Sequence, residues 1–99
     1  MAAPRFPQLV VALGAGDAGV TEAAARALSK LAHENDANRV AIAEAGAIAP
    51  LIKLVRLGSD GAKCYAAAAL WNLADNDDNK VAIAAAGGIA PLVELVKSG

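Results

Sequence analysis

Histidine and cysteine, two residue types that often bind metal ions or act in catalysis, each occur once in this chain. The single histidine is His33 and the single cysteine is Cys64. A zinc site takes three or four nitrogen, sulfur or carboxylate ligands, and these two residues alone cannot form its histidine and cysteine core. We expect no metal site, no catalytic constellation and no cofactor, and we predict that the protein is not an enzyme.

A short polar run has the ligand types of a calcium site. Asp75, Asp77 and Asp78 lie beside Asn76 and Asn79. The spacing and the central glycine of a calcium-binding loop are both missing. Aspartate and asparagine also cap helices, because their oxygens accept hydrogen bonds from the free amides of a first turn. The run therefore indicates a capping turn between helices.

Three glycines near the N-terminus resemble a phosphate-binding loop. Gly14, Gly16 and Gly19 fit the spacing G-x-G-x-x-G, which lets a pyrophosphate approach the start of a helix. A helical stretch follows, and then Arg-Val-Ala-Ile-Ala-Glu, which could be a second strand with Glu44 near its end. A dinucleotide-binding βαβ unit at Gly14–Gly19 is therefore a remote alternative.

An internal repeat argues against that alternative. Residues 38–58 return as residues 79–99 with 14 of 21 positions identical, and residues 8–32 parallel residues 50–74 at an offset of 42. The counterpart of Gly14 is Arg56, and the counterpart of Glu44 is Ala85. A cofactor fingerprint should occur once, so both pieces are better explained as local versions of a structural repeat. A period near 41 residues is typical of stacked helical repeats.

The repeat divides a single domain, residues 1–99, into one complete unit, 38–78, and two partial units, 7–37 and 79–99. The pattern predicts a short, a medium and a long helix in each unit. In the complete unit Asn38 caps a short helix that ends at Gly46, where a left-handed backbone is least unfavourable. Pro50 suits the first turn of the second helix, and Ser59 or Asp60 caps the third.

The long helices are expected to turn a leucine and alanine side towards the core. In the first long helix, Val20–His33, this side contains Ala24, Ala27, Leu28, Leu31 and Ala32. In the third helix of the complete unit it contains Ala66, Ala69, Leu70 and Leu73.

Two motifs in the last units resemble the armadillo repeat family. One is Asn-x-x-x-Ile-x-x-x-Gly-x-Ile-x-x-Leu-Val-x-Leu-Val, present as Asn79, Ile83, Gly87, Ile89, Leu92, Val93, Leu95 and Val96. The other is Ala-Leu-x-Asn-Leu-Ala, present as Ala69, Leu70, Asn72, Leu73 and Ala74. The resemblance implies an all-α fold, a right-handed α-solenoid of about two and a half armadillo repeats. It also implies a non-enzymatic scaffold for protein–protein interaction.

In armadillo proteins the third helices line a concave groove, and an Asn at the Asn72 position commonly bonds the backbone of an extended peptide. The resemblance therefore implies binding of an extended peptide or partner protein along a groove formed by Arg26, Lys30, Ala68, Trp71, Asn72 and Asp75. The peptide-binding families usually place a Trp where this chain has Ala68. Asn72 could instead form a hydrogen bond between repeats, and Trp71 could pack against a neighbouring repeat.

The last partial unit is expected to expose apolar residues, because no third helix follows it in the sequence. The set is Val81, Ile83, Ile89, Leu92, Val93, Leu95 and Val96. An uncovered apolar patch is typical of an interaction surface. We predict a homo-oligomer, with a two-fold dimer as the favoured form because it is the commonest closed symmetry. An alternative function is that of a purely structural, self-assembling repeat fragment. Since neither end carries a polar cap, we expect an excised or designed piece of a longer array.

Composition narrows the partners and the compartment. Nine Lys and Arg face ten Asp and Glu, for a net charge of −1. Nucleic-acid binders normally carry a basic excess, so we expect no nucleic-acid partner. No apolar run reaches the roughly 18 residues of a membrane span, so we expect no membrane partner. A lone cysteine fits a reducing compartment, which favours the cytoplasm, with the nucleus as an alternative.

Overall fold

The computed structural model describes residues 6–98, which form seven α-helices and contain no strand. The helices are α1 (Phe6–Leu13), α2 (Ala18–Ala32), α3 (Asp36–Glu44), α4 (Ile48–Leu57), α5 (Asp60–Leu73), α6 (Asp77–Ala85) and α7 (Ile89–Ser98). Both segments that a βαβ unit would need as strands are helical, in α1 and in α3. The dinucleotide-binding alternative at Gly14–Gly19 is therefore wrong.

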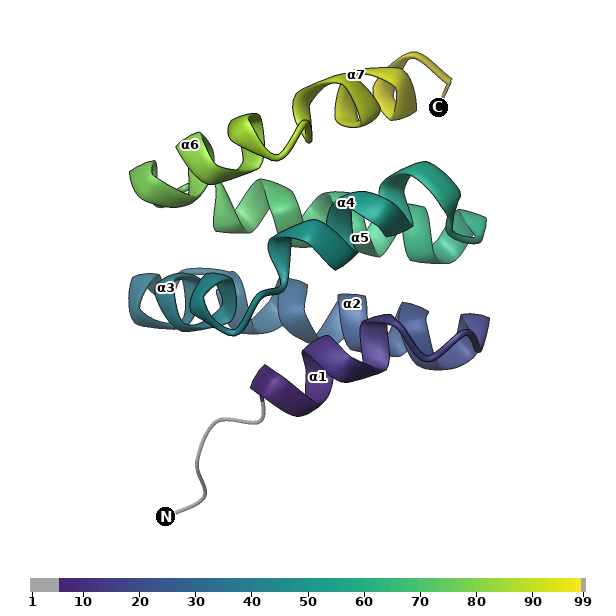
Figure 1. Ribbon diagram of the computed structural model, residues 1–99, viewed down its shortest axis with the longest axis horizontal. Coiled ribbons are helices and arrows are strands. Elements are labelled where there is room, and N and C mark those ends of the chain that lie inside the picture. The colour runs from purple at the N-terminus through teal and green to yellow at the C-terminus, as the bar shows by residue number, and fades with distance from the viewer. Residues whose placement is uncertain (1–5, 99) are drawn as a thin grey trace.

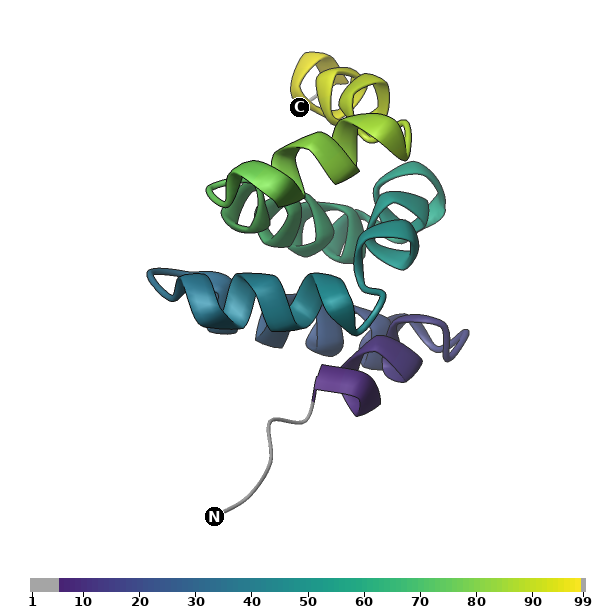
Figure 2. The same ribbon diagram turned by 60° about the vertical axis from the view of Figure 1, so that its left-hand side comes forward.

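The helices stack in layers that follow one another along the chain (Figure 1). Equivalent helices of successive layers contact one another and so form three columns. The second helices α1, α4 and α7 form one column, and the third helices α2 and α5 form another. The first helices α3 and α6 form the last column. The turned view in Figure 2 shows the same succession of layers. This arrangement is an α-solenoid of about two and a half repeats, 42 Å in its longest dimension.

Local sequence signals set most helix ends. Side chains of Asp17, Asn35, Ser59 and Asn76 cap α2, α3, α5 and α6 by accepting a hydrogen bond from the backbone amide three residues later. Gly46 and Gly87, which follow α3 and α6, have φ of +89° and +81°. Glycine adopts this left-handed conformation without steric penalty. The predictions for Gly46, Ser59 and the first-turn position of Pro50 are confirmed.

The predicted cap of α3 is wrong. The helix begins at Asp36, and the cap is Asn35, whose side chain accepts a hydrogen bond from the Asn38 backbone. The Asn38 side chain instead donates to the Leu31 carbonyl at 2.8 Å. Both asparagines can cap a helix. The chain turns at Glu34, which has a φ of +58°, so Asn35 is the residue that directly precedes α3 and caps it.

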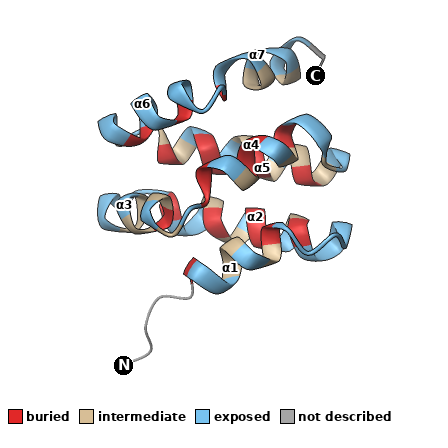
Figure 3. Ribbon diagram, in the orientation of Figure 1, coloured by how far each residue is buried: buried red, intermediate tan, exposed pale blue. Residues whose placement is uncertain are grey.

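The core lies between α2, α4 and α5 (Figure 3). Leu28 and Leu51, together with Leu70 and Leu73, are fully buried, and alanines fill the seam between α2 and α5. Small side chains allow helix axes to approach closely, and α2 and α5 share the largest helix–helix contact among the described residues. The predicted inward residues of α5 are all buried.

Leu31, predicted to face the core, is exposed. Its counterpart Leu73 is buried in a layer where α3 packs against α5. Within residues 6–98 no first helix occupies the corresponding place beside α2. The sequence therefore placed Leu31 on the correct side of α2, and Leu31 is exposed because no described first helix covers that side. Ala27, assigned to the same side, is half-buried.

Within the described residues, no single helix is long and apolar enough to cross a bilayer. Helices α6 and α7 reach that length and hydropathy only together, as a pair bent by 86°.

Candidate functional site

The third helices α2 and α5 lie side by side and bring most of the predicted groove residues onto one face. Arg26 and Lys30 are exposed on α2, and Ala68 is exposed on α5. Asn72 is half-buried between the two helices. This surface, Arg26, Lys30, Ala68 and Asn72, is called the third-helix face below.

Asn72 holds the two third helices together. Its side-chain nitrogen donates to the backbone carbonyl of Ser29 at 2.9 Å and lies 3.2 Å from the Ser29 hydroxyl. The alternative role predicted for Asn72, a hydrogen bond between repeats, is confirmed. Ser29 was not among the predicted site residues. The repeat offset was the available signal, because Ser29 lies 43 residues before Asn72, close to the repeat length.

Trp71 occupies a different side of α5 from the Asn72 contact. A helix turns about 100° per residue, so Trp71 and Asn72 cannot both face α2. The repeat counterpart of Trp71 is Ser29, and Ser29 faces the layer that follows it. Trp71 is 75% exposed. By this equivalence Trp71 points towards the C-terminal end of the stack and not towards Arg26 and Lys30.

Tyr65 is a second residue of this region that sequence reasoning did not assign to the site. The Arg26 guanidinium carbon lies 5.8 Å from the centre of the Tyr65 ring. A cation over an aromatic ring at an exposed site contributes about 0.5–1 kcal/mol. The contact crosses from α2 to α5, so it orients the Arg26 side chain along the third-helix face.

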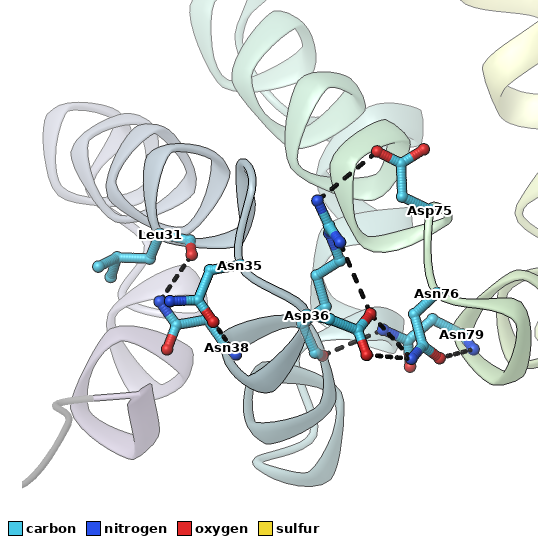
Figure 4. A network of polar contacts seen from close by, with 8 residues as sticks. Leu31, Asn35, Asp36, Asn38, Asp75, Asn76 and Asn79 are labelled. Atoms are coloured by element: carbon cyan, nitrogen blue, oxygen red, sulfur yellow. Dashed lines mark hydrogen bonds and ion pairs between the residues drawn. The ribbon is translucent and has the colours of Figure 1, made fainter.

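Asp75 belongs to a polar network at the end of the third helix (Figure 4). Its carboxylate lies 3.8 Å from Arg39, which also lies 3.6 Å from Asp36. Asn76 donates to Asp36 at 3.1 Å, and the Asn79 side chain donates to the Arg39 carbonyl at 3.0 Å. These contacts join α3 to α6 and to the turn before α6. Asp75 therefore lies near the third-helix face and also connects two layers.

The acidic run 75–79 thus forms a cap and an inter-layer contact. Asn76 caps α6 by accepting from the Asn79 amide at 3.0 Å. Among the described residues no group of three histidine, cysteine or acidic side chains is placed to hold a metal ion.

The apolar surface predicted for the last unit is only partly exposed. Val81, Ile89, Val93 and Val96 are exposed, and Leu92 and Leu95 are half-buried. Ile83 is buried within the core cluster, so its assignment to the open surface is wrong. The counterpart of Ile83 is Ile42, which is also fully buried. The first helix of a layer is therefore covered by the preceding layer, without any layer after it.

Two surface hollows repeat along the second-helix column. One is bordered by Leu13, Gly16, Pro50 and Leu54, and the other by Val55, Gly87, Pro91 and Leu95. They occupy equivalent places between successive second helices. They arise from the stacking of the layers and include none of the predicted groove residues.

The layers of short, medium and long helices define the class of protein, a helical repeat solenoid. Residues 35–75 match the family described as Armadillo/beta-catenin-like repeat. The chain is 47% identical over 69 residues to human Armadillo repeat-containing protein 3, an alignment that covers 70% of this chain and 8% of that protein. The chain is therefore built from armadillo repeats.

Solved structures show the same similarity. A designed armadillo repeat protein superimposes with a TM-score of 0.84 at 33% identity, over 90% of this chain and 38% of that one. An engineered protein from the Northeast Structural Genomics Consortium superimposes with a TM-score of 0.91 at 33% identity, over 97% of this chain and 39% of that one. The chain thus spans well under half the length of each of these three proteins.

Proposed function

We propose that the protein is a non-enzymatic interaction scaffold that binds an extended segment of a partner protein along the third-helix face. The observation that carries this proposal is the row of accessible side chains on two adjacent, mutually bonded helices, α2 and α5. The armadillo fold supports it, because this fold serves protein interaction in general. The rigid pairing of α2 and α5 would keep the face in one shape before a partner arrives.

The chemistry of the face favours an acidic partner segment. Lys30 is exposed, and Arg26 is held in place over Tyr65. Asn72 already uses its side-chain nitrogen towards Ser29. A side-chain amide carries both donor and acceptor groups, so the Asn72 oxygen is the part that would accept a hydrogen bond from a partner's backbone N–H.

A peptide-array screen followed by titration tests this proposal. Lys30→Glu should weaken binding of acidic peptides by at least about tenfold, because it reverses a charge at the face. Asn72→Ala should weaken binding to all hits. Lys53→Glu is the matched control, because Lys53 is an exposed lysine on α4, in the second-helix column. Equal losses for Lys30→Glu and Lys53→Glu would contradict the proposal, since the effect would then be one of net charge alone.

A second candidate function is self-association through the exposed residues of α6 and α7, with a two-fold dimer as the expected form. The observation that favours it is the exposure of Val81, Val93 and Val96 on one end of the stack. Light-scattering mass measured across micromolar dilution tests it. Val96→Glu should shift the chain towards the monomer, whereas Val11→Glu, a comparably exposed valine on α1, should not. A monomer at every concentration excludes this function.

A further inference from the structure

Two serines of this chain follow an arginine by three residues, and the fold places them in very different surroundings. Arg26 precedes Ser29, and Arg56 precedes Ser59, whereas no other serine or threonine of the chain has an arginine at this distance. Serine kinases recognise charge patterns around the residue that they modify, and an arginine three residues before the serine is one that many of them select. By this pattern the two serines are equivalent, so the structure decides which of them a kinase can reach.

Ser29 is held inside the contact between two helices. It lies within α2 and is half-buried. Its hydroxyl oxygen lies 3.2 Å from the Asn72 side-chain nitrogen of α5, which also donates to the Ser29 carbonyl at 2.9 Å. A phosphoryl group would have to displace this contact, and a kinase would have to unwind α2 around it. Ser29 is therefore closed to a kinase in the folded chain.

Ser59 lies in an open turn between α4 and α5. It is exposed, and the backbone of Gly58 and Ser59 is extended, with ψ of 173° and 166°. An extended segment lets a serine hydroxyl reach the nucleotide in a kinase active site. Arg56 and Leu57, which end α4, are exposed as well, so unwinding this last turn uncovers little apolar surface. The segment from Arg56 to Ser59 can therefore enter a kinase while the rest of α4 stays folded.

The Ser59 oxygen can keep its structural role when its hydrogen is replaced. It caps α5 by accepting a hydrogen bond from the Ala62 backbone amide at 3.2 Å, and the hydroxyl hydrogen has no acceptor among the described residues. The buried Thr21 hydroxyl differs, because it donates its hydrogen to the Ala18 carbonyl at 3.1 Å. Phosphorylation replaces the hydroxyl hydrogen with a phosphoryl group. At Ser59 it therefore removes no hydrogen bond that the fold uses.

Two cations lie beside this turn without an ion-pair partner among the described residues. They are Arg56 and Lys63, which border the same surface hollow. In the preceding layer the cap at the equivalent place is Asp17, a carboxylate. The counterparts of the two cations in that layer are the uncharged Gly14 and Thr21. The second layer thus lacks a negative charge at its cap and has two unpaired positive charges beside it.

We propose that Ser59 is a phosphorylation site for an arginine-directed serine kinase, and that Arg56 and Lys63 hold the phosphate that it then carries. In this reaction the Ser59 Oγ forms a bond to the γ-phosphorus of ATP while the bond from that phosphorus to the β–γ bridging oxygen breaks. ADP leaves with that oxygen, and the hydroxyl proton passes to the catalytic aspartate of the kinase. Ser59 lies outside the third-helix face, so this inference does not rest on the proposed function.

Acidic groups near the site oppose a phosphate less than the cations support it. Asp60 directly follows Ser59, and Glu94 borders the same hollow as the two cations. A phosphate carries close to two negative charges and three acceptor oxygens. It should therefore displace the single carboxylate of Glu94 in competition for Arg56 and Lys63. The free amides in the first turn of α5 also attract negative charge, so the phosphate should connect the end of α4 to the start of α5.

Incubation of the full chain with a calmodulin-dependent protein kinase and ATP tests the modification. Intact-mass spectrometry should show one added phosphoryl group, and fragmentation should place it on Ser59. Ser59→Ala should abolish incorporation, whereas Ser29→Ala should leave the rate unchanged. Ser29 is the matched control because it has the same preceding arginine. Phosphate on Ser29, or none on Ser59, would overturn the proposal.

Recognition of the turn is tested by Arg56→Ala, which should lower kcat/KM of the kinase for this chain by about tenfold because it removes the selected charge. Lys53→Ala is the control, since Lys53 is the other exposed cation of α4. Equal losses of kcat/KM in the two variants would show that the kinase responds to positive charge in general. That result would contradict a specific site at Ser59.

Phosphorus NMR of the phosphorylated chain tests whether the cations hold the phosphate. The second pKa of a phosphoserine without such partners is about 6. Nearby cations favour the dianion, so the pKa in this chain should lie below that value, and Lys63→Gln should raise it. Circular dichroism should show that the phosphorylated chain keeps its helices. A pKa that does not change in Lys63→Gln would contradict the proposed contact between the phosphate and this lysine.

Discussion

Helices α4 and α7 both begin with Ile-Ala-Pro-Leu, yet they differ sharply in burial. Val55 of α4 is 4% exposed, and its counterpart Val96 of α7 is 80% exposed. The difference comes from position in the stack, because α4 has α5 and α7 on its sides and α7 has no layer after it among the described residues. Burial in this protein is therefore a property of neighbouring layers more than of local sequence, as expected for a solenoid.

The largest contrast is expected between two equivalent leucines. Leu51→Ala removes a fully buried side chain from the core, which lowers the free energy of unfolding by about 2–5 kcal/mol. Leu92→Ala removes a half-buried one and should lower it by about 1 kcal/mol or less. Urea denaturation followed by circular dichroism measures both. Equal losses of unfolding free energy in the two variants would contradict the difference in burial between α4 and α7.

A smaller contrast is expected between two equivalent asparagines, Asn38 and Asn79. The Asn79 side chain is buried and donates to Arg39 of the preceding layer. The Asn38 side chain donates to the backbone carbonyl of Leu31, in the last turn of α2, at an exposed site. Asn79→Ala removes this inter-layer hydrogen bond from a buried site and should lower the free energy of unfolding by about 1 kcal/mol. Asn38→Ala should have less than half that effect in the same urea titration. The reverse order would show that the inter-layer bond contributes nothing.

The smallest contrast concerns the helix caps Asn35 and Asn76. Each cap should contribute about 1 kcal/mol to the free energy of unfolding. Asn76 also donates to Asp36 of the preceding layer, so Asn76→Ala should exceed Asn35→Ala by about 0.5 kcal/mol. Thermal unfolding of the two variants checks the difference. The double variant Asn76→Ala with Asp36→Ala should lose less free energy of unfolding than the sum of the two single losses, because both single variants break the same bond. Strictly additive losses would show that this inter-layer bond does not contribute to stability.

Features that depend on a few adjacent residues could be predicted from the sequence. The repeat, the three-helix unit, the turn at Gly46, the cap at Ser59 and the buried side of α5 were all predicted correctly. Each follows from periodicity or from the backbone preference of one residue type. The βαβ alternative at Gly14 was wrong because its glycines belong to a turn between two helices, α1 and α2.

Features that depend on a neighbouring layer were not predicted correctly. Leu31 was expected inside and lies outside, whereas Ile83 was expected outside and lies inside. The assignment of Trp71 to the groove stays a prediction, because its side chain is exposed and lies on another side of α5 from Asn72. The choice of Asn35 over Asn38 as a cap was also missed, since both residue types suit the role. The pattern of a single sequence shows which residues share one side of a helix. It does not show which side is covered by a neighbouring helix.

Native-state hydrogen exchange tests the central claim most directly, because it compares α4 and α7 in the unaltered chain. Amides of a helix between two layers should exchange only when the stack opens, and amides of an end helix should exchange by local opening. We predict that the protected amides of α7 exchange at least about tenfold faster than their counterparts in α4, which corresponds to about 1.4 kcal/mol. Equal protection of the two helices would contradict the conclusion that neighbouring layers determine burial in this protein more than local sequence does.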